Sequence, residues 1–259
     1  MTARTTAGWQ VVAVQELRDL WRSTKGLSVL FGFTVLLSAM AYAAASEADL
    51  NLLDSRESVG LVGQAAIALG ALAALVVSAD AISGERERGT LESILVTPLS
   101  RRDLVIGKLV AASTMWLAAV AVAVPYLATM GRGPGISLDA VLTVCLAGSL
   151  AAAALTALGL AISAVSYSNR ASLAASVALL ILLAAPSQLP AITTRSTLGS
   201  ILIKANPVAA GMRLTDQVLV KQHSWSSQWT LLLAPAIAAV VLTGLAVRMS
   251  RRLELGDSR

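Results

Sequence analysis

Six long runs of apolar residues, each free of charged side chains, divide the sequence. A helix that crosses the hydrocarbon core of a bilayer needs about 20 such residues. The runs therefore predict six transmembrane helices, at 26–45, 58–79, 109–130, 140–165, 171–192 and 229–247. Only 14% of all residues are charged and 4% are aromatic, whereas an ordinary soluble domain has about 25% charged residues. This composition excludes a soluble enzyme and favours closely packed helices over an aromatic-girdled barrel.

The basic residues set the orientation of these spans. With both termini in the cytoplasm, 14 of the 20 Lys and Arg residues fall in cytoplasmic segments, in agreement with the positive-inside rule. No repeat or low-complexity linker separates the spans. The sequence therefore predicts one multi-pass domain over 1–259, in the plasma (inner) membrane, with both termini cytoplasmic.

The first 25 residues have a pattern of their own. Trp9, Val12, Leu17 and Trp21 recur at helical spacing, opposite polar residues such as Arg18. The pattern predicts an amphipathic helix that lies in the cytoplasmic interface ahead of the first span. Packing of this helix on a soluble partner is a compatible alternative.

The predicted spans contain no Asp, Glu, Lys, Arg or His, and such side chains mark proton relays and many ion-coupled carriers. Gln64 is the one strongly polar residue deep in a span; it either lines a pathway or hydrogen-bonds a neighbouring helix. The single histidine, His223, and the single cysteine, Cys145, cannot form a metal cluster. The basic residues form no continuous stripe, which argues against nucleic acid as a partner.

Nucleotide-binding and catalytic motifs are absent from the sequence. The phosphate-binding loop requires G-x-x-x-x-G-K-[ST], whereas the sole Gly-Lys pair, Gly107-Lys108, is followed by Leu109. The nucleophile elbow G-x-S-x-G and the H-E-x-x-H helix are absent as well. We therefore expect this chain to be no enzyme and to bind no cofactor, so that any ATP is hydrolysed by another subunit.

The segment between the second and third predicted spans combines both signs of charge with an apolar face. Residues 85–88 alternate in sign, and Leu91, Ile94 and Leu95 follow at the spacing of one helix face. These residues predict a short amphipathic helix that projects between two spans. A helix this short is marginal alone and needs a partner surface.

Local signals end this helix and begin the next one. Thr97 precedes Pro98, and a residue in that position disfavours helical backbone. Ser100 with Asp103 then resembles a capping box. The third span is therefore expected to begin as a helix near Ser100.

The string ERERGTLESILVTPLSRRDLVIGKLVA, which begins at Glu85, closely resembles the signature of permease subunits of ATP-binding-cassette (ABC) exporters of the type 2 permease class. The shared features are a Glu-rich turn, Gly-Thr-Leu-Glu, a Thr-Pro step and a Gly-Lys ahead of the third span. The amphipathic N-terminal helix, six spans and a longer outer segment between spans five and six are similar to the family in architecture. The resemblance implies an all-α integral membrane fold and a role as the transmembrane subunit of an ABC transporter.

In that family the short cytoplasmic helix is the coupling helix, which sits in a cleft of the ATPase subunit and carries its motion to the spans. The resemblance implies an ATPase partner that holds ATP and Mg, and a second permease copy in a homo- or heterodimer. The residues implied to face or shape the ATPase contact are Glu85, Glu87, Gly89, Thr90, Leu91, Glu92 and Leu95, with Pro98 and Arg101 at the elbow.

The outer segment at 193–228 is also similar to the family's. Asn206 followed by Pro207 is a strong helix start, and Val208, Met212 and Leu219 then share one helix face. The resemblance implies short re-entrant helices that seal an outer gate. The sequence alone suits a helix lying flat on the membrane surface equally well.

The resemblance favours the transmembrane subunit of an exporter, and the Ala-rich spans mildly favour an apolar or amphiphilic cargo. A second function is mechanotransmission without transport, in which the complex acts on an extracytoplasmic protein. The sign-alternating turn weakly resembles family members associated with copper-enzyme maturation, which work in this manner. A third, a carrier driven by an ion gradient, is disfavoured by the uncharged spans.

Overall fold

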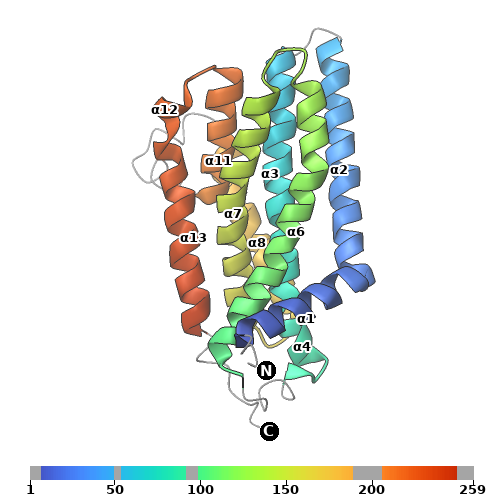
Figure 1. Ribbon diagram of the computed structural model, residues 1–259, viewed down its shortest axis with the longest axis vertical. Coiled ribbons are helices and arrows are strands. Elements are labelled where there is room, and N and C mark those ends of the chain that lie inside the picture. Colours follow the sequence, from blue (N-terminus) through green and yellow to red (C-terminus); the bar gives the residue numbers. More distant parts are fainter. Residues whose placement is uncertain (1–6, 50–53, 92–98, 189–205, 250–259) are drawn as a thin grey trace, which may run out of the picture.

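Long helices run side by side along the longest axis of the molecule (Figure 1). The computed structural model describes residues 7–49, 54–91, 99–188 and 206–249. The described residues contain no strand, which confirms the all-α prediction. The helices are α1 (Gly8–Arg22), α2 (Thr24–Asp49), α3 (Ser55–Asp80), α4 (Ser83–Glu87), α6 (Arg101–Met130), α7 (Ser137–Val165), α8 (Asn169–Gln188), α11 (Pro207–Thr215), the π-helix η1 (Asp216–Val220), α12 (Trp225–Gln228) and α13 (Thr230–Met249).

Five helical segments are long and apolar enough to cross a membrane: Thr24–Ala48, Ser55–Glu87, Arg101–Met130, Ser137–Val165 and Thr230–Met249. They contain five of the six predicted spans, so the chain is a membrane protein with several apolar helices. The span predicted at 171–192 corresponds to α8, in which Asn169–Leu183 is an apolar helical stretch. Residues 189–192 lie outside the described part of the chain.

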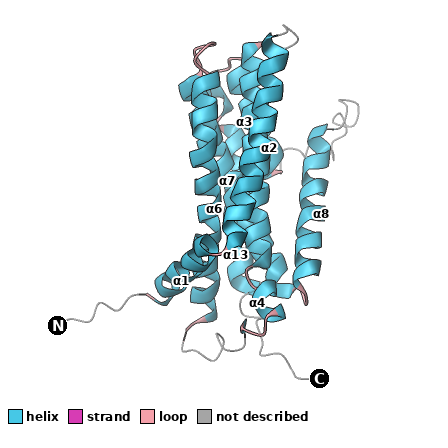
Figure 2. Cartoon of the chain, turned by 90° about the vertical axis from the view of Figure 1, so that its right-hand side faces the viewer, coloured by secondary structure: helices cyan, strands magenta, loops and turns pink. Residues whose placement is uncertain are grey.

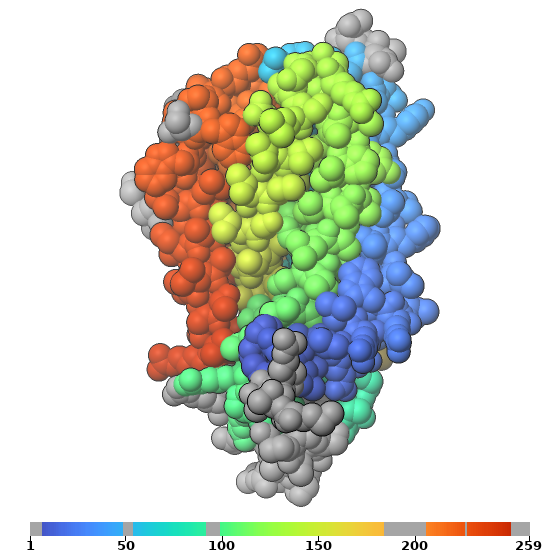
Figure 3. Space-filling view, viewed as in Figure 1, coloured from blue at the N-terminus to red at the C-terminus, as the bar shows by residue number. Residues whose placement is uncertain are grey.

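The centre of the bundle is the pair α3 and α7, which pack closely along their lengths. Both helices bury small residues, which allow backbones to approach. On the face seen in Figure 3, α13, α7, α6 and α2 lie next to one another, and α1 crosses their lower end. The buried small residues of the central pair include Gly63, Gly70, Ala74, Ala147, Gly148 and Ala151.

Trp116 of α6 fills the space that two glycines leave between α3 and α7. A Cβ atom at Gly148 would come within 2.3 Å of the indole ring, and one at Gly70 within 2.6 Å. The indole Nε1 donates a hydrogen bond to Ser149 Oγ at 2.9 Å, so the ring is fixed in this position. The helices α3, α6 and α7 therefore pack together because the Trp116 indole fills the space that Gly70 and Gly148 leave open.

Gly148→Val is expected to lower the free energy of unfolding by about 1–3 kcal/mol, because the valine must displace the indole of Trp116. Gly32→Val on α2 is the matched control, since a Cβ atom there meets nothing within 4 Å. Thermal unfolding in detergent compares the two variants with the wild type. Equal midpoints for Gly148→Val and the wild type would contradict this packing.

The two ends of the bundle differ in construction. α1 and α4 lie at one end, called the α4 end, and α11 and α12 lie toward the other, called the α11 end (Figure 1).

Asn206 caps α11 as predicted, because its Oδ1 accepts from the N–H groups of Val208 and Ala209 at 3.0 and 3.3 Å. α11 packs against α3, α7 and α13, and most of its residues are buried. A helix lying flat on the membrane surface, one of the two expectations for this segment, would not be covered in this way.

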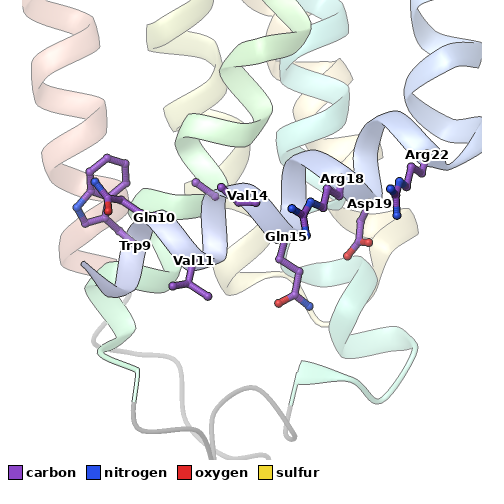
Figure 4. A pocket seen from close by; sticks show the side chains of 9 residues that line it. Trp9, Gln10, Val11, Val14, Gln15, Arg18, Asp19 and Arg22 are labelled. Carbon is purple, nitrogen blue, oxygen red and sulfur yellow. The ribbon is translucent and has the colours of Figure 1, made fainter. Parts of the chain in front are cut away.

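α1 crosses the α4 end and packs mainly on α6 (Figure 1). Its amphipathic character is as predicted: Val12 is buried, and the Trp21 indole donates to Thr114 Oγ1 of α6 at 3.1 Å. Its other side is open, with the apolar Val11 and Val14 exposed along the same helix as the charged Arg18 (Figure 4). The apolar face of α1 therefore packs, at least in part, on α6 of the same chain.

Candidate functional site at the α4 end

The chain turns sharply between α3 and α4, and α7 holds this turn in place. The backbone N–H groups of Ile82 and Ser83 both donate to Ser163 Oγ of α7, at 3.0 and 2.8 Å. The Ser83 hydroxyl donates back to the carbonyl oxygen of Ala79 at 2.8 Å. Both serines are fully buried, so the start of α4 has a fixed position on the bundle.

The alternating charges of α4 match the ends of two other helices. The Arg86 guanidinium donates to the carbonyl oxygens of Ser166 and Ala164, the latter at 3.1 Å, where α7 ends. Glu87 Oε2 accepts from the backbone N–H of Asn169 at 3.0 Å, where α8 begins (Figure 2). Helix C-termini carry partial negative charge and N-termini partial positive charge. The Arg and the Glu therefore each meet the helix end of opposite sign, and α4 is bound to both α7 and α8.

A buried lysine links α4 to α1 and α6. Lys108 of α6 has no exposed side-chain surface, and its Nζ lies 2.5 Å from Glu16 Oε1 of α1 and 2.6 Å from Glu85 Oε1 of α4. A buried ammonium is tolerated only when carboxylates and hydrogen bonds replace its water. We call Lys108, Glu16 and Glu85 the Lys108 hub. Together with the contacts of Arg86 and Glu87, it joins α4 to four other helices.

α4 is shorter than the helix expected from the sequence. It ends at Glu87, because Gly89 adopts φ +70° and the Thr90 N–H donates to the carbonyl oxygen of Glu85 at 3.0 Å. This left-handed backbone at a helix end strongly favours glycine. The prediction of one continuous helix that carries Glu85 and then Leu91, Ile94 and Leu95 is therefore wrong, since the glycine turn interrupts it at 88–90. Residues 92–98 lie outside the described part of the chain.

The residues expected at the ATPase contact fall into three groups. Leu91 and Glu85 are only 4% and 9% exposed and face the chain's own interior. Glu92, Leu95 and Pro98 lie outside the described residues. The exposed group consists of Glu87, Gly89, Thr90 and, at the start of α6, Arg101. Arg88, which the resemblance did not single out, is exposed among them, so 87–90 is the described part of α4 and its turn that is open to a partner.

Comparison with known proteins agrees with this architecture. The family model described as ABC-2 family transporter protein matches residues 10–254. The chain belongs to the ABC-2 transporter family. It is 34% identical over 100 residues to the probable ABC transporter permease protein NosY of Stutzerimonas stutzeri, a match that covers 38% of this chain and 36% of that protein. The sequence is therefore that of a membrane-embedded permease subunit of an ABC transporter, although it aligns with only about a third of this relative.

Gln64 of this ABC-2 permease lies on α3, well away from the Lys108 hub. Its side chain is half-buried and has no hydrogen-bond partner within the described ranges. The described helices thus give no support to the expectation that Gln64 bonds a neighbouring helix within the same chain. The other expectation, that Gln64 lines a pathway, belongs to the function proposed below.

Sequence reasoning missed Lys108, the buried cation that joins α1, α4 and α6. Lys108 appeared only as part of a Gly-Lys pair ahead of a span, yet it shares a buried helix face with Leu104, Ala111 and Met115. The spacing of these residues is that of a single helical stripe. A lysine on such a stripe indicates a buried charge that needs carboxylate partners, and this signal was available before the structure.

Proposed function

We propose that this ABC-2 permease couples ATP hydrolysis by a separate ATPase subunit to movement of a substrate across the membrane, as an exporter. The observation that carries the proposal is the exposed end of α4 at 87–90, on a helix bonded to α1, α6, α7 and α8. A force applied at this end reaches four helices through short polar contacts. The α4 end is then cytoplasmic, both chain termini are cytoplasmic, and α8 is the fifth of six spans.

In this proposal the buried Glu85 and Leu91 have a different role from the exposed residues. They shape the ATPase contact from inside, because they fix the turn on which Glu87, Gly89 and Thr90 are displayed. Glu92, Leu95, Pro98 and Arg101 complete the contact and its elbow in the family pattern. Exposed charges of both signs favour a docking register with one orientation.

Two permease copies, identical or related, form the pathway in this proposal, and Gln64 lies on a surface that faces it. ATP binding closes the ATPase pair and moves the α4 ends together. This shifts the population between inward- and outward-open bundles, because ATP has different affinities for the two states. ATP and Mg stay on the ATPase subunit, and this chain supplies no catalytic group.

Chemical cross-linking tests the docking step. In a Cys145→Ala background, which has no other cysteine, Thr90→Cys labelled with a photoreactive maleimide is expected to cross-link to the co-purified ATPase. His223→Cys, exposed near the α11 end, is the matched control and is expected to give no such product. An ATP-hydrolysing complex in which Thr90→Cys gives no cross-link, or in which both sites react equally, would contradict the proposal.

Mechanotransmission to an extracytoplasmic protein is a second candidate, favoured by the packing of the α11 end. Asn206 donates to the carbonyl oxygen of Leu183 on α8, and the Trp225 indole donates to Asp139 of α7 at 3.4 Å. Motion of α7 and α8 would therefore reach this outer surface. ATP-dependent capture of an outer partner without vesicle uptake of cargo would favour this candidate over export.

A further inference from the structure

The Lys108 hub contains two carboxylates and only one cation. Glu16 of α1 and Glu85 of α4 both meet the ammonium of Lys108, at 2.5 and 2.6 Å. The ammonium is fully buried, and the side chains of Glu85 and Glu16 are only 12% and 23% exposed. With both carboxylates ionised, the hub therefore carries one excess negative charge in a largely buried position. Burial and a neighbouring like charge both favour the protonated form of a carboxyl group.

One oxygen of the hub is placed to hold a proton. Glu85 Oε2 is buried, and no donor among the described residues reaches it. An ionised carboxylate with such an oxygen is costly, because nothing replaces the hydrogen bonds that water would make. A proton on Oε2 neutralises Glu85 and leaves Oε1 able to accept from Lys108 as before. The hub then contains one cation and one anion, and both contacts with Lys108 persist.

The other charged groups near the hub do not balance its excess charge. They are Asp19 on α1, Lys25 on α2, Asp80 on α3, and Arg86, Glu87 and Arg88 on α4. Lys25 and Asp80 pair with each other at 3.0 Å, while Arg86 and Glu87 bind the ends of α7 and α8. The remaining two side chains are exposed, so that water and salt screen their charges.

Proton binding by Glu85 depends on whether α4 is packed. Glu85 lies beyond the span predicted at 58–79, and burial raises the pKa of its carboxyl above the ordinary value of 4.5; Lys108 opposes this rise and Glu16 adds to it. When α4 leaves the bundle, Glu85 is hydrated and regains its ordinary pKa. Between pH 4.5 and the raised value, the packed state therefore holds more protons than the released state. The stability of the packed state thus falls as the pH rises through this window.

We propose that the Lys108 hub is a proton-sensitive lock on α4. Uptake of one proton by Glu85 holds α4 against α1 and α6, and loss of this proton favours release of α4 and of the turn at 88–90. The lock makes the attachment of α4 to the bundle follow the pH on that side of the membrane. It belongs to the permease alone and is measured without an ATPase, so its outcome is independent of the coupling function proposed above.

Thiol labelling at position 91 measures the release of α4. Leu91 is 4% exposed, whereas its neighbour Thr90 is exposed. Leu91→Cys and Thr90→Cys, each in the Cys145→Ala background, are labelled with a maleimide in detergent over a series of pH values. The ratio of the two rates cancels the ionisation of the thiol and reports the opening of α4. We expect this ratio to rise with pH by up to about tenfold for each pH unit, the limit for one linked proton.

Neutral variants of the acidic residues locate the proton. Glu85→Gln is expected to abolish the rise and to keep the ratio low at every pH, because its amide is neutral like the protonated acid. Glu16→Gln leaves one carboxylate for one cation and is expected to make the rise smaller. Asp19→Asn is the matched control on α1, since Asp19 is exposed and lies outside the hub. It is expected to keep the full rise.

Hydrogen exchange repeats the comparison where Leu91→Cys does not fold. The Thr90 N–H donates to the carbonyl oxygen of Glu85, so its exchange rate, divided by the intrinsic rate at each pH, reports the same opening with Leu91 intact. Three results would overturn the proposal. They are an opening that is constant or decreases with pH while Glu85 is intact, an equal rise in Glu85→Gln, and loss of the rise in Asp19→Asn, which would place the proton on Asp19.

Discussion

Lys108→Met is expected to lower the free energy of unfolding by about 3 kcal/mol, because it leaves two carboxylates without their shared cation in a buried place. Glu85 is 9% exposed, and the Glu16 side chain is 23% exposed. Neither can recover full hydration while α1, α4 and α6 stay packed. We expect α1 and α4 to detach from α6 before the rest of the bundle unfolds. Thermal or chemical unfolding of the purified permease in detergent measures the loss.

The triple variant Lys108→Met/Glu16→Gln/Glu85→Gln is the control for this prediction. It removes the cation and both negative charges together, and neutral replacement of a complete buried ion group is often close to neutral in stability. It is therefore expected to recover most of the stability that Lys108→Met loses. An unfolding midpoint of Lys108→Met equal to that of the wild type would show that the hub does not hold these helices together.

Arg86→Glu is expected to uncouple the transporter while leaving it assembled. The substitution removes two charge-assisted hydrogen bonds to the end of α7 and places a negative charge against carbonyl oxygens there. Each such bond contributes about 1.5–3 kcal/mol. The equilibrium constant for contact between α4 and α7 is therefore expected to fall by at least about tenfold. The exposed residues Arg88 to Thr90 are unchanged, so docking of the ATPase is expected to persist.

Arg132→Glu is the matched control for Arg86→Glu, because it makes the same substitution in an exposed turn between α6 and α7, away from α4. It is expected to keep assembly and coupling at the level of the wild type. Loss of ATPase co-purification in Arg86→Glu, with retention in Arg132→Glu, would mean that Arg86 serves docking and not transmission.

Much of the fold was predictable because the hydrocarbon core of a bilayer allows few backbone structures. Apolar runs of sufficient length have few alternatives to membrane helices, and five predicted spans lie in helices that meet this requirement. Local capping chemistry was equally readable: Ser100 accepts from the Asp103 N–H at 3.1 Å, and Asn206 caps α11. Both signals act within a few residues and need no tertiary partner.

The candidate site was harder to predict, because its burial depends on contacts between distant segments. Glu85 pairs with a lysine 23 positions later, and Glu16 lies 92 positions from that lysine. A charge run such as 85–88 is indistinguishable from a solvated helix face until α7 and α8 are placed beside it. The burial of Leu91 was unpredictable for the same reason, since its apolar cluster includes residues of α1, α6, α7 and α13.

The most direct measurement follows ATP-driven motion at the α11 end while α4 is altered. A fluorophore is attached at His223→Cys in the Cys145→Ala background, and the permease is reconstituted with its ATPase in liposomes. If α4 carries the motion, ATP changes the fluorescence with Arg86 intact, and Arg86→Glu reduces the change by at least about tenfold while ATP hydrolysis continues. A full fluorescence change in the Arg86→Glu complex would contradict the claim that Arg86 carries the motion of α4 to α7 and on to the α11 end.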